Sequence, residues 1–514
     1  MAPPPPDAWA DLPVFEKDLY MEHPAVTARS EAETRAFRAS RGITVTDAPS
    51  RAGTSTPAPA RSFEECSFPK YLHTQLLASG FREPSPVQAQ AWPLVLSGRN
   101  LVAVAATGSG KTLAYALPAV VHVNAQPYLD ERNGDGPIVV VLAPTRELVA
   151  QIAAVFQTYA ASSKITTVAV YGGAPRAPQQ KLLRQKTCEV IAATPGRLLD
   201  FVDAGDVSLA TRVTFLVVDE ADRMLDLGFE PQIRKISEEI RPDRQTLMFT
   251  ATWPRAVAAA AAALSPDAAS LRVSQSGAQS SDQSSDALSG SLHAHLPADV
   301  KHVLELVRER DKYARLVSVL ETRLESGEEK NTTTRRAPGD ARRVVVFFSS
   351  KARADDATRA LRADGFSALA MHGDKAQDER EWVLREFRDG TAPVLLATDV
   401  AARGLDVAGV FTVINYDAPG SAEAFVHRVG RTGRRYHTRV IDPCGDETRE
   451  AKRTKHDVNV TYTNGVGESE SEETHTFLCP SSRADAKVAG SLIRTLRANG
   501  RAVSDAVAAF ANGS

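Results

Sequence analysis

Two series of short, unbroken apolar runs constrain the fold more than any other feature of this sequence. The first series lies between about residues 63 and 272. Its members are LVAVA (101–105), IVVVLA (138–143), EVIAA (189–193), FLVV (215–218) and TLMF (246–249). Because the runs are continuous rather than alternating, they are typical of strands that helices cover on both faces. The intervening lengths suit crossover helices, so we predict a parallel α/β domain.

The second series follows a polar stretch, SQSGAQSSDQSSDALSGS at 274–291, that can bury almost no apolar surface and is expected to be a linker. Helical segments such as 377–388 separate the runs of this series. Its members are VVVFF (344–348), ALAM (368–371), VLLAT (394–398) and FTVINY (411–416). The sequence therefore predicts an α/β fold of two tandem parallel-sheet domains joined by a flexible linker.

Changes in composition set the predicted domain limits. Residues 1–62 are rich in Pro, Ala, Ser and Thr and show little periodicity, so we predict a disordered N-terminal tail. The first domain, the linker, the second domain and a C-terminal tail are then expected at 63–272, 273–300, 301–500 and 501–514.

Composition excludes several classes of protein. No apolar run approaches the roughly 18 residues of a membrane helix, and no signal-peptide pattern opens the chain. We therefore expect no membrane association and a location in the nucleus and cytoplasm. The four cysteines are far apart without a CxxC pair, so we expect them to be reduced and to form no zinc site. A net charge of -2 argues neither for nor against nucleic acid.

The stretch AATGSGKT, residues 105–112, lies between a predicted strand and a predicted helix. Glycines at 108 and 110 allow backbone N–H groups to turn toward phosphate, Lys111 supplies a charge to the β- and γ-phosphates, and the Thr112 hydroxyl can ligate Mg²⁺. Ala105 replaces the first glycine of the usual pattern. A Gly-rich turn with an exposed lysine is the alternative, but the strand before and the helix after favour a phosphate loop.

The stretch FLVVDEADRML, residues 215–225, places acids directly after an apolar strand. In a parallel sheet this is the carboxyl edge, where ligands bind, so Asp219 can hold a metal and Glu220 can polarise an attacking water. An ordinary acidic first turn of a helix is the alternative. The phosphate loop upstream favours the nucleotide interpretation.

Further motifs recur in order at predicted strand ends. They are GFREPSPVQ (80–88), APTREL (143–148), GG (172–173), TPGR (194–197), TAT (250–252), ATDVAARGLD (397–406) and HRVGRTGR (427–434). Together with the phosphate loop and Asp219 to Asp222, they resemble the DEAD-box RNA helicases of superfamily 2 over about residues 63–500. The resemblance implies two RecA-like domains, with ATP, Mg²⁺ and RNA as ligands. It also implies RNA-stimulated ATP hydrolysis that unwinds short duplexes and remodels RNA–protein complexes.

The amino-acid sequences of several segments indicate one subgroup of the family. AWPLVLSGRN, MLDLGFEPQIRKI and HGDKAQDER look closest to the nuclear subgroup that acts in mRNP assembly, ribosome biogenesis and mRNA decay. The protein is expected to act as a monomer, with protein partners that the motifs do not identify.

The resemblance assigns the ATP side of the site. Phe63 is expected to stack on adenine and Gln88 to read its edge, whereas a core Phe and a surface Gln are the alternative. The phosphate-loop, ribose-binding and arginine-finger positions fall on Thr107, Gly108, Ser109, Gly110, Lys111 and Thr112, on Asp406, and on Arg431 and Arg434. A basic solvated loop is the alternative for the fingers. Since fingers and phosphate loop lie in different domains, hydrolysis is expected to require domain closure.

The resemblance also assigns RNA and coupling positions. RNA is expected at Arg146, Gly172, Gly173, Thr194, Pro195, Gly196, Arg197 and Thr398, which offer N–H, hydroxyl and guanidinium groups to phosphates and 2′-OH. Coupling between ATP and RNA is expected at Thr250, Thr252, Gln377, Arg380, His427 and Arg428. The family usually has Ser-Ala-Thr where this chain has Thr-Ala-Thr, so both hydroxyls remain.

The sequence departs from the family after Arg434. A strand-like THTFLCP, residues 474–480, resumes only after about forty residues, and loop-closure entropy tolerates such a length. We expect a disordered surface insert at 435–473, either a tolerated insertion or translated intron sequence. This departure leaves open a second function, an ATP-gated RNA clamp or scaffold with impaired hydrolysis. A DNA translocase is a third, less favoured, function.

Overall fold

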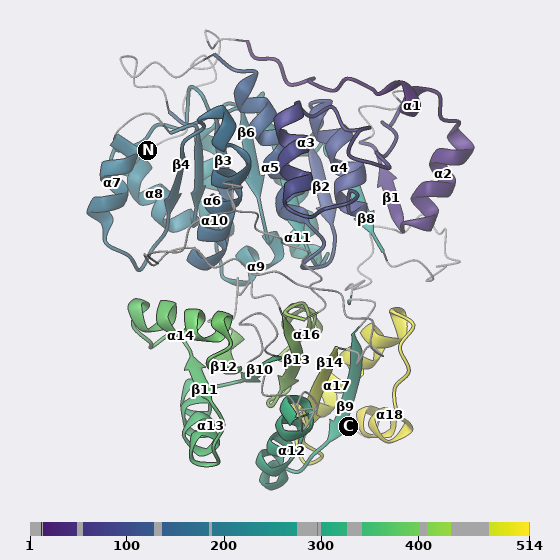
Figure 1. The fold of residues 1–514 in the computed structure, drawn as a ribbon, viewed down its shortest axis with the longest axis vertical. Coiled ribbons are helices and arrows are strands. Elements are labelled where there is room, and N and C mark those ends of the chain that lie inside the picture. Colours follow the sequence, from purple (N-terminus) through teal and green to yellow (C-terminus); the bar gives the residue numbers. More distant parts are fainter. Residues whose placement is uncertain are drawn as a thin grey trace, which may run out of the picture.

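The computed structural model describes residues 12, 14–48, 55–127, 136–184, 188–274, 296, 300–325, 342–399, 409–432 and 472–512. Within these residues the chain forms two parallel-sheet α/β domains, drawn one above the other in Figure 1. The predicted fold class is confirmed. Most of the predicted linker lies outside the described residues, but Val273 belongs to a strand of the first sheet and Val300 is buried. None of the described helices is long and apolar enough to cross a membrane.

The first sheet has eight strands, and all its pairings are parallel except that of β1 with β8. In sheet order they are β1 (Ile43–Thr46), β8 (Ala269–Val273), β2 (Leu101–Val104), β7 (Gln245–Thr250), β6 (Phe215–Val218), β3 (Val139–Leu142), β5 (Val190–Ala193) and β4 (Thr167–Val170). The five predicted strands match β2, β3, β5, β6 and β7 to within one residue at each end. Sequence reasoning missed β1, β4 and β8.

Helices cover both faces of this sheet. One face packs against α3 (Lys70–Ala78), α4 (Pro86–Leu96), α5 (Lys111–Asn124) and α6 (Arg146–Tyr159). The other packs against α8 (Pro195–Asp203), α9 (Ala221–Asp226), α10 (Glu230–Glu239) and α11 (Arg255–Leu264), and α7 (Arg176–Arg184) lies near β4. Strand β3 shows why its run is continuous, because Val139 belongs to one core and Val140 to the other. Alternate side chains point to opposite faces.

The prediction of a disordered tail at 1–62 is wrong for the described part of that segment. Helices α1 (Pro24–Thr27) and α2 (Glu31–Ser40) form there, and β1 extends the sheet. Largely buried ion pairs join Arg29 to Glu65 at 2.7 Å and Asp47 to Arg99 at 2.6 Å. The segment is held mainly by arginine pairs and strand pairing, so it lacks the apolar periodicity that the prediction sought.

The second sheet has six strands, all paired in parallel. In sheet order they are β11 (Ala368–Met371), β12 (Val394–Thr398), β10 (Arg343–Phe348), β13 (Val410–Asn415), β14 (Glu473–Leu478) and β9 (Lys301–Leu306). The surrounding helices are α12 (Lys312–Glu325), α13 (Lys351–Ala363), α14 (Gln377–Asp389), α16 (Ala422–Val429), α17 (Arg483–Ala498) and α18 (Asp505–Asn512). The predicted tail at 501–514 is wrong where α18 forms, because Val507 is buried against Leu478 and Ile493.

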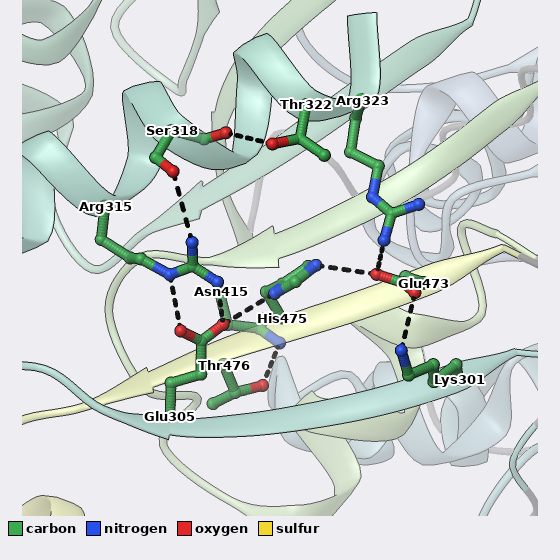
Figure 2. A network of polar contacts seen from close by, with 10 residues as sticks. All are labelled: Lys301, Glu305, Arg315, Ser318, Thr322, Arg323, Asn415, Glu473, His475 and Thr476. Atoms are coloured by element: carbon green, nitrogen blue, oxygen red, sulfur yellow. Dashed lines mark hydrogen bonds and ion pairs between the residues drawn. The ribbon is translucent and has the colours of Figure 1, made fainter. Parts of the chain in front are cut away.

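Strand β14 begins at Glu473, so the predicted insert ends too late; residues 433–471 lie outside the described residues. Figure 2 shows why this acid is ordered. Glu473 accepts a hydrogen bond from Lys301 at 3.1 Å and one from Arg323. The ring nitrogens of His475 lie 2.8 Å from a Glu305 oxygen and 3.1 Å from a Glu473 oxygen. Glu473, the last residue of an acid run that resembles a solvated loop in sequence, is therefore matched by cations from β9 and α12.

Candidate active site

The predicted phosphate loop lies between β2 and the start of α5, so the strand before it and the helix after it are as expected. Gly108 and Gly110 have φ values of 77° and 90°, which favour glycine, and Gly110 is the N-cap of α5. Lys111 is buried, and its Nζ donates to the carbonyl oxygen of Ala105 at 2.9 Å. The Ser109 hydroxyl is buried and has no hydrogen-bond partner among the described residues. A helix N-terminus with an ammonium group and a spare hydroxyl fits phosphate oxygens.

Gln88 lies against this loop. Its Oε1 accepts from the Ser85 backbone at 3.0 Å, and its Nε2 donates to the Gly110 carbonyl at 3.1 Å. A Cβ added to Gly110 would lie 2.4 Å from that Nε2, so the contact requires glycine. Phe63, by contrast, is only 2% exposed and packs near Trp92 with ring centroids 6.1 Å apart. The structure therefore gives Phe63 the core position that was its alternative, and stacking on adenine would require its ring to move.

The acidic motif follows β6 at the carboxyl edge. Asp219 is buried and accepts hydrogen bonds from the Tyr115 hydroxyl and from the backbone of Glu220, both at 2.9 Å. Burial raises the pKa of Asp219 to about 6, while Lys111 opposes that shift. Glu220 has φ of 50°, an uncommon left-handed conformation at the N-cap of α9. Such conformations cluster at active sites, where they aim a side chain.

The oxygens of Asp219 and Thr112 are the hard donors that Mg²⁺ prefers. The described residues contain no group of three or more His, Cys, Asp or Glu that could enclose a metal ion. This donor set fits Mg²⁺, which is usually held by one or two protein oxygens together with substrate phosphates and water.

Asp222 joins the two domains. Its Oδ2 accepts from the Thr252 backbone at 2.9 Å, the Thr252 hydroxyl at 2.7 Å and His427 Nε2 at 3.1 Å. Burial alone would raise the pKa of Asp222, but His427, Lys111 and the Thr252 hydroxyl lower it below its usual range. Burial lowers the pKa of His427, so a neutral ring donates to a carboxylate. Thr250 supports this cluster by donating to the Thr252 carbonyl at 2.8 Å. The sequence analysis gave Asp222 no role of its own.

The loop after α16 touches the phosphate loop. A Cβ added to Gly430 would lie 1.7 Å from the Thr107 hydroxyl oxygen, so the two loops are in close contact. Arg431 comes next; it is buried, and its Nε donates to the His427 carbonyl at 3.1 Å. The second arginine-finger position, Arg434, and the ribose-binding position, Asp406, lie outside the described residues.

Arg428 stays within the second domain. Its guanidinium donates to both carboxylate oxygens of Asp399, at 2.7 and 2.8 Å, and to the Asp417 carbonyl at 2.8 Å. Arg428 therefore holds the loops of the second domain in place, whereas His427 makes the link to the first.

A second contact between the domains lies among the predicted RNA residues. Arg380 donates to Glu147 Oε1 at 2.7 Å, and Arg146 donates to the same oxygen at 3.1 Å. Arg146 also reaches the Gly173 carbonyl at 3.5 Å. Glu147, which sequence reasoning missed, thus brings Arg146 and Arg380 together, and Arg146 adds the contact to Gly173. Gln377 instead bonds Glu381 of its own helix at 2.6 Å.

The other predicted RNA positions lie at strand ends and helix starts. A Cβ added to Gly172, in the turn after β4, or to Gly196, in the first turn of α8, would meet nothing within 4 Å, so both positions are open on that side. Thr194 is the N-cap of α8 with no side-chain cap bond, and Pro195 follows it as the first helical residue. Arg197 donates to the Ala174 carbonyl at 3.2 Å, and Thr398 is the last residue of β12. RNA contact at these positions stays a prediction.

Comparison with known proteins follows the same division of the chain. A DEAD/DEAH box helicase model matches residues 85–260, and a helicase conserved C-terminal domain model matches residues 331–436. The sequence is 47% identical over 427 residues to ATP-dependent RNA helicase DBP2 of Chaetomium thermophilum, covering 83% of this chain and 70% of that protein. It is 46% identical over 423 residues to DEAD-box ATP-dependent RNA helicase 20 of Arabidopsis thaliana, covering 82% and 76%.

The fold is similar to that of S. cerevisiae Dbp5 bound to RNA and ADP BeF3. The TM-score is 0.64 at 24% sequence identity, covering 86% of this chain and 95% of that one. A likeness at this identity bears on the fold of the two domains.

Proposed function

This chain belongs to the DEAD-box ATP-dependent RNA helicases, and we propose that it works by closing its two domains over ATP and RNA together. The bond between Asp222 and His427, with Gly430 against Thr107, carries this proposal. These contacts join the acidic motif and phosphate loop of one domain to the arginine-finger loop of the other. Hydrolysis that depends on such closure responds to whatever stabilises the closed pair, including bound RNA.

The roles on the ATP side follow from the chemistry of each group. Lys111 and the loop N–H groups bind the phosphates, and Gln88 contributes to recognition of the nucleotide. Thr112 and Asp219 would hold Mg²⁺, which neutralises phosphate charge when bound. Glu220 accepts the proton of the attacking water. Arg431 and Arg434 then stabilise charge on the transferred phosphoryl group from the second domain.

The roles on the RNA side follow from the open loops. Backbone N–H groups at the predicted glycines and the guanidinium groups of Arg146 and Arg197 contact phosphates and 2′-OH groups, which carry little base information. Closure bends one strand and separates a short duplex locally. Release of phosphate then reopens the pair through the contacts of Arg380 and His427.

A finer assignment concerns the cellular location of the enzyme and the RNA processes in which it acts. We place the enzyme, as a monomer, in the nucleus and cytoplasm, acting in mRNA decay, mRNP assembly and rRNA processing. This assignment is supported by the sequences of its motifs and by the 47% identity to a DBP2-type helicase.

The test compares ATP turnover with RNA and with DNA of the same sequence, in the wild type and in Glu220→Gln. We expect stimulation by RNA alone, and at least about 100-fold slower turnover in Glu220→Gln because an amide cannot accept a proton. That variant should still bind ATP and should release RNA more slowly than the wild type. Wild-type protein that holds RNA with ATP but shows no turnover would establish the clamp alternative. Equal stimulation by DNA would favour a DNA translocase.

A further inference from the structure

Helix α4, which carries Gln88, is buried along its length. All residues from Val87 to Leu96 are buried, although the helix contains a second glutamine, Gln90, that is 0% exposed. A fully buried amide destabilises the fold unless both its oxygen and its nitrogen find partners. Its partners therefore show what covers the outer side of this helix.

Both partners come from the N-terminal segment. Arg38 Nε donates to Gln90 Oε1 at 2.8 Å, and Gln90 Nε2 donates to the Pro57 carbonyl at 2.9 Å. Arg38 closes the ring through a second donor to the same Pro57 carbonyl at 2.9 Å. Three groups from distant parts of the chain thus satisfy one another around the middle of α4.

Two further contacts join the N-terminal segment to α4 and to the residues just after it. The Ala60 backbone donates to the Ala89 carbonyl at 2.9 Å, between the two glutamines. Just beyond the end of α4, Arg99 pairs with Asp47 at 2.6 Å and donates to the Ser55 carbonyl at 2.7 Å. The N-terminal segment therefore contacts α4 and its C-terminal end at several positions.

The other side of α4 faces the phosphate loop. Gln88 is fixed by its bond to the Ser85 backbone and reaches the Gly110 carbonyl, where a single added carbon would collide with it. A small shift of α4 therefore changes the contact between Gln88 and the loop. The route from Arg38 to the loop passes through Gln90, two residues from Gln88 on one rigid helix.

We infer that residues 14–48 and 55–60, which we call the N-terminal brace, set the position of Gln88 and so the affinity for the nucleotide. Arg38 is its main positioning residue. The inference rests on the proposed role of Gln88 in nucleotide recognition. The contacts of the brace go to Gln90, Ala89 and Arg99 and not to the phosphate loop, so its effect on nucleotide binding is separate from the chemistry of hydrolysis.

The test replaces Arg38 and measures the KM for ATP, kcat, and the Kd of a fluorescent ADP analogue on the full chain. For Arg38→Met we expect KM and Kd to rise about tenfold with kcat within about twofold, since hydrogen bonds to a charged group are lost but no catalytic group is. Arg38→Lys keeps a charged donor and should be intermediate. The matched control is Arg35→Met on the same helix, because the Arg35 side chain is 71% exposed and pairs with exposed Glu31. Its KM, kcat and Kd should be unchanged.

Two further variants make each outcome decisive. Arg38→Met combined with Gln90→Leu removes both partners of the buried bond, so it should recover thermal stability while nucleotide affinity stays low. If affinity recovers with stability, Arg38 acts on folding alone and the inference is wrong. Gln88→Ala separates the two proposals: weaker binding there with normal binding in Arg38→Met overturns the brace only, whereas normal binding in Gln88→Ala overturns the role of Gln88 and the brace with it.

Discussion

Among the described residues, two of the contacts that join the domains differ in kind. On the ATP side, a neutral His427 donates to Asp222 in a site where both side chains are only 4% exposed. On the RNA side, Arg380 pairs with Glu147, whose side chains are 15% and 13% exposed. A buried hydrogen bond works in one geometry, whereas an ion pair nearer to solvent acts over a range of distances and is weakened by salt. The contact between His427 and Asp222 should therefore depend more strongly on full domain closure than the contact between Arg380 and Glu147.

The largest effect is expected on the ATP side. His427→Ala removes a hydrogen bond to a buried carboxylate, worth about 1.5–3 kcal/mol, so RNA-stimulated kcat should fall by about 10- to 100-fold. Binding of ADP to the first domain should not change, because its phosphate loop is intact. Steady-state ATPase with saturating RNA and ADP titration check this. An unchanged kcat would show that closure does not depend on Asp222.

A second prediction concerns Thr250, which supports the same cluster. Thr250→Val removes the bond to the Thr252 carbonyl, and we expect duplex unwinding to fall about tenfold while ATPase falls less than about threefold. Thr250→Ser keeps the hydroxyl and should resemble the wild type in both assays. Equal loss of unwinding and ATPase in Thr250→Val would reject a coupling role.

A smaller effect is expected on the RNA side. Glu147→Gln removes the carboxylate shared by Arg146 and Arg380, and RNA affinity with a non-hydrolysable ATP analogue should fall by about 3- to 10-fold at low salt. The difference from the wild type should shrink as salt rises. RNA titrations at two salt concentrations measure it. A loss that does not change with salt would mean that the two interdomain contacts are of one kind.

The smallest effect on activity is expected from the polar network of Glu305, Arg315, His475 and Glu473, which lies within the second domain rather than between the domains. Burial alone would raise the pKa of Glu305, but His475 and Arg315 lower it to about 2. A carboxyl with a lowered pKa contributes stability that is present above its unfolded value, about 4.5, and is lost as pH falls toward 2. Glu305→Gln should lower Tm at pH 7, and the difference from the wild-type Tm should shrink as pH falls below about 4.5 and close only near pH 2.

Calorimetry from pH 7 to pH 2 measures this convergence. RNA-stimulated ATPase of Glu305→Gln should stay within about twofold of the wild type at temperatures well below Tm, because the described partners of Glu305 are Arg315 and His475, neither of which is assigned to ATP or RNA. A Tm difference as large at pH 2 as at pH 7 would show that packing, and not charge, carries the contribution.

Local patterns were sufficient for much of this protein. Strand β6 matches its predicted limits, because an unbroken apolar run is compatible with only a buried strand or a buried helix and its length selects the strand. The tight turn between β2 and α5 was predictable because Gly108 and Gly110 adopt a left-handed backbone, which glycine favours. The family motifs are likewise contiguous, so the DEAD-box resemblance needed no knowledge of contacts.

Tertiary structure alone decided which of those motifs meet. The partners Asp222 and His427 lie 205 positions apart, and Glu147 and Arg380 lie 233 apart, so no local period or spacing links them. The same reason hid the N-terminal brace, where Arg38 finds Gln90 at a separation of 52. A polar side chain looks solvated in sequence until folding supplies its partner, because burial becomes favourable only when both groups of the hydrogen bond arrive together.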